Sequence, residues 1–183
     1  MRIKISADST CDLSPELIET HNIGITPLYI EKGGQNCRDG MDITPQEIFD
    51  YVRSGKGVCR TAAVNVGDYT AFFKKCRENY DAVIHFNISS DFSSCYQNAC
   101  TAAAEFENVY VVDSRNLSTG IALLVLDAAE RAANRLCPAN ARAHTVQCNC
   151  RSCRGTFCPR PFCRPSLQCT ALASINSRRA PPR

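Results

Sequence analysis

Residues 81–88 (DAVIHFNI) and residues 108–112 (NVYVV) are short runs in which most residues are apolar and many are β-branched. Such nearly continuous apolar runs are typical of strands that are covered on both faces, as in a parallel sheet. Each run is followed by polar turn residues and then by a helical pattern, and the last of these patterns places an apolar stripe over residues 117–132. Strands that alternate with helices of this length indicate βαβ units with right-handed crossovers. The two runs therefore predict an α/β fold with a mostly parallel sheet flanked by helices.

The segments that precede residue 81 fit the same alternation. Residues 2–6 alternate as a strand does, and residues 14–16 (SPE) then supply a helix N-cap, a proline at the first helical position and an acid in the first turn. Residues 25–30 (ITPLYI) are predicted as a second strand, with a proline that favours an edge and a turn at the following Gly-Gly pair. Residues 44–47 (TPQE) form a capping box before a short helix, and a stripe within residues 65–76 predicts a longer one.

The composition of the chain changes at Cys137. Residues 137–183 hold 8 Arg, 6 of the 9 Pro and 7 of the 13 Cys, and they contain no Lys, Asp or Glu. Subtracting these residues from the totals leaves 13 basic and 18 acidic residues in residues 1–136, so the two parts carry net charges of −5 and +8. We therefore divide the chain into an α/β domain at residues 1–136 and an irregular tail at residues 137–183.

Three interpretations of the tail are open. A stretch rich in Arg, Pro, Cys and Ala without acids is typical of an out-of-frame reading of a GC-rich gene, and we favour this interpretation. A native, disordered basic extension is the second, and it would bind RNA without sequence specificity. The third is a zinc site, because Cys148, Cys150 and Cys153 stand at CxC and CxxC spacing near His144. We expect no specific nucleic-acid role.

The sequence predicts a cytoplasmic protein. Its first residues, MRIKI, lead directly into the polar residues 8–10 (DST), without the apolar region of a signal peptide, and no run of 18 apolar residues occurs. In a reducing compartment the six cysteines before residue 136 are expected to be free thiols.

Hydroxyl side chains follow three of the predicted strands. They occur in residues 8–10 (DST), in residues 89–94 (SSDFSS), and in residues 113–119 (DSRNLST). Taken singly, each of these residues can be a simple helix N-cap. Ligands of open α/β sheets bind outside the carboxyl ends of the strands, where helix N-termini favour anions. Three clusters at one edge of a sheet therefore indicate a site for a carboxylate or a phosphate.

Several catalytic motifs are missing from the sequence. It contains neither GxGxxG nor GxxxxGK[ST], and it contains no GxSxG nucleophile elbow. His21 and His85 are the imidazole bases before residue 137, and His85 stands inside an apolar strand where a structural histidine is the simpler interpretation. A serine hydrolase is therefore hard to assemble, although a small-molecule α/β enzyme with an unrecognised active site remains an alternative.

Six ordered motifs of the chain resemble those of the DegV family of bacterial fatty-acid-binding proteins. They are residues 8–13 (DSTCDL), 27–30 (PLYI), 38–43 (RDGMDI), 61–65 (TAAVN), 88–97 (ISSDFSSCYQ) and 112–115 (VDSR). The resemblance covers roughly residues 2–136, which correspond to the N-terminal α/β domain of the family. It implies a second α/β domain that the tail does not resemble, so we expect a truncated member of the family.

The resemblance also implies a function and a site. Family members bind a long-chain fatty acid whose carboxylate is held by a threonine and a serine hydroxyl, and the matching residues here are Thr61 and Ser93. They act as carriers that present the fatty acid to an ATP-dependent fatty acid kinase subunit. The resemblance thus implies a lipid-binding protein with no catalytic residue, no cofactor and no metal. Hydroxyls at the predicted sheet edge are expected to be secondary head-group or loop residues, and these are Ser9, Thr10, Ser90 and Ser114.

The chain departs from the commoner family pattern beside both site residues. Many members have TSQPS where this chain has residues 61–65 (TAAVN), and many have SGTYQ where it has residues 93–97 (SSCYQ). Both differences keep the key hydroxyl and change its neighbours. We therefore carry over Thr61 and Ser93 and leave out the surrounding hydrogen bonds.

Overall fold

A computed structural model describes residues 2–133, and within them the larger sheet has four parallel strands in the order β2-β1-β6-β7. The strands are β1 (Ile3–Asp8), β2 (Gly24–Thr26), β6 (Ala82–Asn87) and β7 (Val109–Asp113). A turn of 3₁₀-helix, η1 (Ser9–Cys11), follows β1. The α/β fold with a parallel sheet is therefore confirmed. The predicted tail, residues 137–183, lies outside the described residues.

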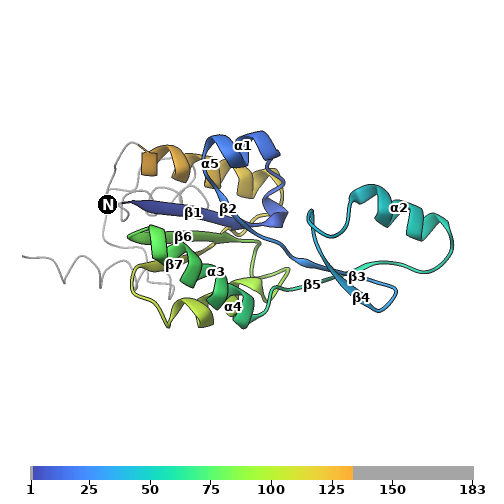
Figure 1. Cartoon of the computed structure of the whole chain (residues 1–183). Coiled ribbons are helices and arrows are strands. Elements are labelled where there is room, and N and C mark those ends of the chain that lie inside the picture. The colour runs from blue at the N-terminus through green and yellow to red at the C-terminus, as the bar shows by residue number, and fades with distance from the viewer. Residues whose placement is uncertain (1, 134–183) are drawn as a thin grey trace, which may run out of the picture.

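Helices cover both faces of this sheet (Figure 1). Helices α1 (Pro15–Thr20) and α5 (Thr119–Ala133) lie on one face, and α3 (Val66–Asn79) and α4 (Cys95–Ala103) lie on the other. The N-cap predicted for the first helix forms, because the Ser14 Oγ accepts a hydrogen bond from the Leu17 N–H. Asn65 caps α3 in the same way, its Oδ1 accepting a hydrogen bond from the Asp68 N–H. Because each cap satisfies a backbone donor at a helix start, these two helix starts could be predicted from local sequence.

A second, antiparallel sheet extends away from the first and was not predicted (Figure 1). Its strand order is β4-β3-β5, formed by β3 (Tyr29–Lys32), β4 (Gln35–Arg38) and β5 (Arg60–Ala62). The prediction of one strand over residues 25–30 was wrong, because the chain leaves the parallel sheet after Thr26 and enters the second sheet at Tyr29. Pro27 lies at this transition, and a proline has no N–H with which to continue a ladder. The predicted Gly33-Gly34 turn is confirmed, with both residues at positive φ.

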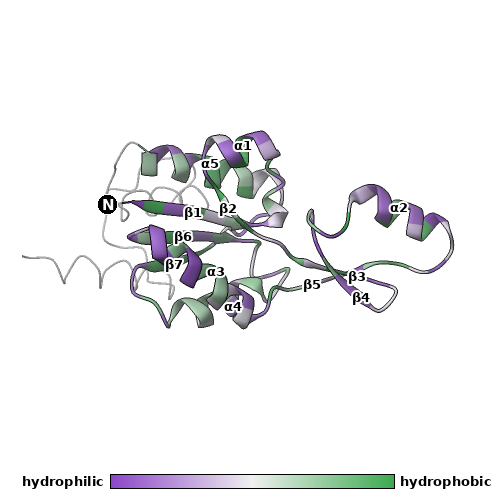
Figure 2. Cartoon of the chain, in the orientation of Figure 1, coloured by the Kyte–Doolittle hydropathy of each residue, from purple (hydrophilic) through white to green (hydrophobic). Residues whose placement is uncertain are grey.

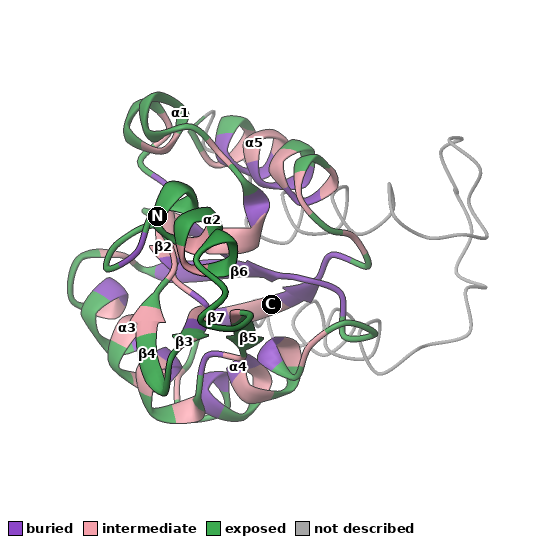
Figure 3. Ribbon diagram, turned by 90° about the vertical axis from the view of Figure 1, so that its right-hand side faces the viewer, coloured by how far each residue is buried: buried purple, intermediate pink, exposed green. Residues whose placement is uncertain are grey.

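Helix α2 (Pro45–Arg53) belongs to this projecting part and has no buried residue. Its capping box between Thr44 and Glu47 forms as predicted. Figure 2 shows both hydrophobic and hydrophilic residues along α2, and Figure 3 shows the helix mostly exposed. Phe49 is 57% exposed although its spacing in the sequence places it on one apolar face of the helix with Ile48 and Val52. Amphipathic spacing therefore predicted the helix but not the burial of its apolar face.

Strand β6 lies at the centre of the core, and all six of its residues are buried. His85 is one of them, with rings of Tyr69, Phe72 and Phe73 from α3 at centroid distances of 5.4, 6.0 and 5.5 Å. Its Nδ1 shares a hydrogen bond of 2.9 Å with the Ser6 hydroxyl, and its Nε2 has no hydrogen-bond partner among the described residues. This burial lowers the pKa of His85 to about 3, so the imidazole is neutral in the folded protein.

The buried histidine makes the fold sensitive to acid. Below the ordinary pKa of about 6.5, His85 binds a proton in the unfolded chain but stays neutral in the folded protein. Protonation therefore stabilises the unfolded state, and the folded protein loses stability as the pH falls from 6.5 toward 3. We expect this one group to lower the free energy of unfolding by about 2 kcal/mol between pH 7 and pH 5. Denaturant unfolding of the parent and the H85L variant at both pH values measures it.

The comparison of variants separates this histidine from other titrating groups. Between pH 7 and pH 5, the free energy of unfolding of H85L should fall by about 2 kcal/mol less than that of the parent, whatever the stability of H85L at pH 7. An equal decrease in the free energy of unfolding between pH 7 and pH 5 in H85L and the parent would contradict this account.

Candidate anion site at the sheet edge

The loops that follow β1, β6 and β7 meet at the carboxyl edge of the parallel sheet, as the sequence predicted. The three strands are adjacent and parallel, so their carboxyl ends lie side by side. Backbone hydrogen bonds join the loops: the Ser118 N–H donates to the Thr10 carbonyl at 3.0 Å, and the Ser89 N–H donates to the Asn116 carbonyl at 3.1 Å. The edge is therefore a connected polar surface built from distant parts of the sequence.

Asp8 anchors this edge from inside. Its buried carboxylate accepts hydrogen bonds from the Thr10 hydroxyl and, at 2.7 Å, from the Ile88 N–H. The Asn87 amide, which lies 3.4 Å from the same carboxylate, also donates to the Tyr69 hydroxyl at 2.8 Å. Burial raises the pKa of Asp8, and the hydrogen bonds from Thr10 and Ile88 partly oppose that shift. Asp8 thus joins the ends of β1 and β6, and its oxygens face the protein.

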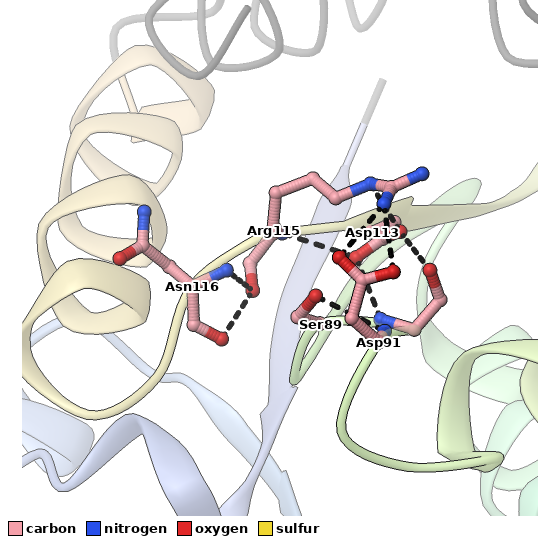
Figure 4. A network of polar contacts seen from close by, with 7 residues as sticks. Ser89, Asp91, Asp113, Arg115 and Asn116 are labelled. Carbon is pink, nitrogen blue, oxygen red and sulfur yellow. Dashed lines mark hydrogen bonds and ion pairs between the residues drawn. The ribbon is translucent and has the colours of Figure 1, made fainter. Parts of the chain in front are cut away.

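Asp113 plays the same part at the end of β7 (Figure 4). One carboxylate oxygen accepts the Ser90 hydroxyl at 2.6 Å, and the other accepts the Ser90 N–H at 3.1 Å and the Arg115 N–H at 3.0 Å. The Arg115 Nε lies 2.9 Å from the Asp113 carboxylate, whose side chain is fully buried. The same guanidinium contacts Asp91, so the loops after β6 and β7 are held together.

Four of the six predicted site hydroxyls donate their proton within the protein. Ser9 donates to the Asp39 carboxylate at 2.7 Å, Thr10 to Asp8, Ser90 to Asp113, and Ser114 to the Asn116 carbonyl at 3.2 Å. A hydroxyl has one proton to donate, so these four cannot donate to a bound anion while the bonds hold. The hydrogen bonds of these four hydroxyls hold the loops together.

Thr61 and Ser93 differ from these four. Thr61 is exposed on β5, where it pairs with Ile30 of β3, and Ser93 is partly exposed just before α4. The Ser93 Oγ accepts a hydrogen bond from the Cys95 N–H at 3.2 Å. Within residues 2–133, neither the Thr61 nor the Ser93 hydroxyl donates a hydrogen bond. Among the described residues, therefore, nothing takes either of these hydroxyl protons.

The segments that carry these two residues are joined to each other. The Asn98 amide of α4 donates to the Val64 carbonyl at 2.8 Å, and Val64 lies three residues after Thr61. Figures 1 and 3 both show β5 beside α4, and α3, which follows β5 in the chain, packs against α4. The second sheet thus carries Thr61 to the same side of the molecule as the start of α4. The sequence prediction missed this connection, since β5 and Asn98 gave no local signal of it.

The start of α4 is suited to an anion. Helices α1, α2 and α3 have N-cap side chains that accept a first-turn N–H, whereas the N-cap of α4, Ser94, makes no such bond. First-turn N–H groups and the positive end of the helix dipole favour negative charge. Neutral N–H and O–H donors of this kind suit a carboxylate.

The described part of the chain contains neither a candidate metal site nor a candidate membrane-spanning helix. No three His, Cys, Asp or Glu side chains among residues 2–133 are grouped so that they could hold a metal ion. The tail cysteines of the zinc interpretation lie outside that range. No helix in the same range combines the length and the apolar character needed to cross a membrane.

Comparison with known proteins gives one consistent result. A family model described as "Uncharacterised protein, DegV family" matches residues 2–152, a range that extends past the composition break at Cys137. A DegV domain-containing protein of Clostridium perfringens is 36% identical over 130 residues, which cover 70% of this chain and 47% of that protein. Another, from Deinococcus radiodurans, is 34% identical over 131 residues, or 71% of this chain and 47% of its own. The chain therefore spans about half the length of the curated relatives it matches.

Solved structures agree with this comparison. A DegV family protein from Thermus thermophilus, described as binding a fatty acid, has a TM-score of 0.75 and 34% identity, covering 79% of this chain and 52% of its own. A stearic acid-binding protein from Eubacterium ventriosum has a TM-score of 0.72 and 29% identity over the same shares. The resemblance noted in the sequence is confirmed.

The Asp113 contacts predict that Ser90 stabilises the fold. Removing its hydroxyl in the S90A variant leaves a buried carboxylate without one short hydrogen bond, which should lower the free energy of unfolding by about 1.5 to 3 kcal/mol. The matched S94A variant removes an exposed hydroxyl that makes no capping bond, so it should change stability by less than about 0.5 kcal/mol. Equal stabilities of S90A and S94A in denaturant unfolding would show that this bond is not important.

Proposed function

Because the chain belongs to the DegV family, we propose that it binds a long-chain fatty acid whose carboxylate accepts hydrogen bonds from the hydroxyls of Thr61 and Ser93. One observation carries this proposal: of the six candidate hydroxyls, these two alone keep their proton free of an acceptor within residues 2–133. The N-cap residue of α4, Ser94, makes no side-chain capping bond, and this supports the same choice.

The chemistry of the site suits a fatty acid. Neutral hydroxyls bind a carboxylate without a fixed countercharge, and a hydrogen bond to a charged acceptor contributes about 1.5 to 3 kcal/mol. Most of the affinity then comes from the acyl chain, because burial contributes about 0.8 kcal/mol per CH₂ before ordering costs. Specificity among fatty acids would reside in the shape of the acyl tunnel. In the family this tunnel takes contributions from both domains, and we propose that the described part of this chain supplies the head-group side.

We further propose that the protein acts as a carrier, presenting the bound fatty acid to an ATP-dependent fatty acid kinase in the cytoplasm. The surroundings of the site support a carrier more than an enzyme. His85 is buried in the core behind α3, and His21 lies at the end of α1 on the other face of the sheet, so neither imidazole stands beside Ser93. The kinase would supply the nucleotide and the phosphoryl transfer, and this chain the oriented carboxylate.

The two hydroxyls can be tested by substitution in the full chain. The T61V and S93A variants each remove a donor to the carboxylate and should weaken binding of decanoate by about tenfold or more. Decanoate is a soluble probe, and its titration followed by backbone amide chemical shifts in NMR measures weak dissociation constants directly. The acyl contacts are unchanged, so some binding should remain.

Two variants serve as matched controls. T101V removes an exposed threonine hydroxyl on α4 that donates to the Gln97 carbonyl, and S54A removes an exposed serine hydroxyl at the end of α2 that donates to the Tyr51 carbonyl. Both should bind decanoate as the parent does. Unchanged affinity in the T61V/S93A double variant would remove the head-group assignment, and an absence of decanoate-dependent shifts in the parent would argue against lipid binding by this chain.

A further inference from the structure

We propose that Arg115 is a positioning residue whose guanidinium holds the loop before α4 in the geometry that presents the Ser93 hydroxyl to the ligand. This inference rests on the proposed function, since it concerns the same head-group site. Arg115 lies in the loop between β7 and α5, whereas Ser93 lies in the loop between β6 and α4. Its influence therefore passes between two neighbouring loops at the edge of the sheet.

The guanidinium of Arg115 bridges two carboxylates (Figure 4). Its Nε lies 2.9 Å from Asp113, and its Nη1 lies 3.1 and 3.2 Å from the two oxygens of Asp91. Arginine suits this role because its planar group presents several donors in fixed directions. The bridge connects the end of β7 to the loop that contains Ser93.

The two ends of the bridge differ in burial. The Asp113 side chain is fully buried, whereas that of Asp91 is 70% exposed. A buried carboxylate needs a paired cation, so Asp113 holds the guanidinium firmly. The Arg115 backbone reinforces this contact: it adopts a left-handed conformation with φ of 52°, and its N–H also donates to Asp113. Arg115 is thus fixed at the β7 end and restrains the freer Asp91 at the other.

The turn that contains Asp91 transmits this restraint to Ser93. The Ser89 carbonyl accepts hydrogen bonds from the Phe92 N–H at 2.9 Å and the Ser93 N–H at 3.3 Å, and the Ser89 Oγ accepts one from the Asp91 N–H at 3.2 Å. Residues 89–93 therefore form one compact turn. A displacement of Asp91 within such a turn displaces Ser93 as well. Releasing the bridge should leave the hydroxyl present but less well oriented.

A double-mutant cycle tests whether Arg115 acts through Ser93. The experiment measures decanoate binding by NMR titration for the parent, R115M, S93A and R115M/S93A, with R131M as the matched control. Arg131 pairs with Asp127 near the C-terminal end of α5, so it tests the loss of another arginine–carboxylate pair. R115M should weaken binding by about fivefold in the parent and by less than about twofold in the S93A background. R131M should bind as the parent does.

Each outcome decides one of the two proposals. An equal loss from R115M in both backgrounds, or no loss in the parent, would overturn the positioning role. If S93A itself binds decanoate as the parent does, the head-group assignment fails, and the role of Arg115 fails with it. If R115M does not fold, D91N breaks the bridge at its exposed end and should give the same pattern. Restored affinity in R115K, which keeps the charge beside Asp113, would further support the role.

Discussion

Parallel pairing of the buried strand β6 with β1 and β7 is the constraint on which the rest of the structure depends. Every residue of β6 is buried, so the strand must be covered by helices on both faces. The pairing also fixes where the chain can place polar groups, because the three strands end at the same edge. Asp8 and Asp113 lie at the ends of the two outer strands of this trio, and each uses its carboxylate to bind the loop of the neighbouring strand. The loop after β6 is therefore held from both sides by hydrogen bonds.

The distribution of hydroxyl protons separates structural from functional candidates at this edge. Serine and threonine are abundant in all three loops, and sequence alone does not rank them. The structure separates the six candidate hydroxyls by a simple rule, since a hydroxyl donates one proton and four of the six already donate to a carboxylate or a carbonyl. Asp39, Asp8 and Asp113 hold the loops by accepting the protons of Ser9, Thr10 and Ser90. Among the six candidates, Thr61 and Ser93 make no such donation within residues 2–133.

The projecting sheet adds a second level of organisation. Thr61 belongs to β5, a three-residue strand whose place depends on pairing with β3, about thirty residues earlier. Helix α2 lies between them in sequence and packs none of its residues into the core. The apolar side chains of this part are divided, because Phe49 and Val58 are exposed whereas Ile30 and Ile43 are buried.

The sequence by itself determined the elements whose signals are local: the buried strands at 82–87 and 109–113, the capped helices that begin at Pro15, Pro45 and Val66, and the family resemblance carried by its motifs. It also named Thr61 and Ser93, though only through that resemblance. Tertiary structure alone decided the split of residues 25–30 between two sheets, the exposure of α2, and the bridge from Arg115 to Asp91. These features depend on contacts between residues far apart in the chain, and neither periodicity nor capping patterns record which distant partner a strand or a charge will meet.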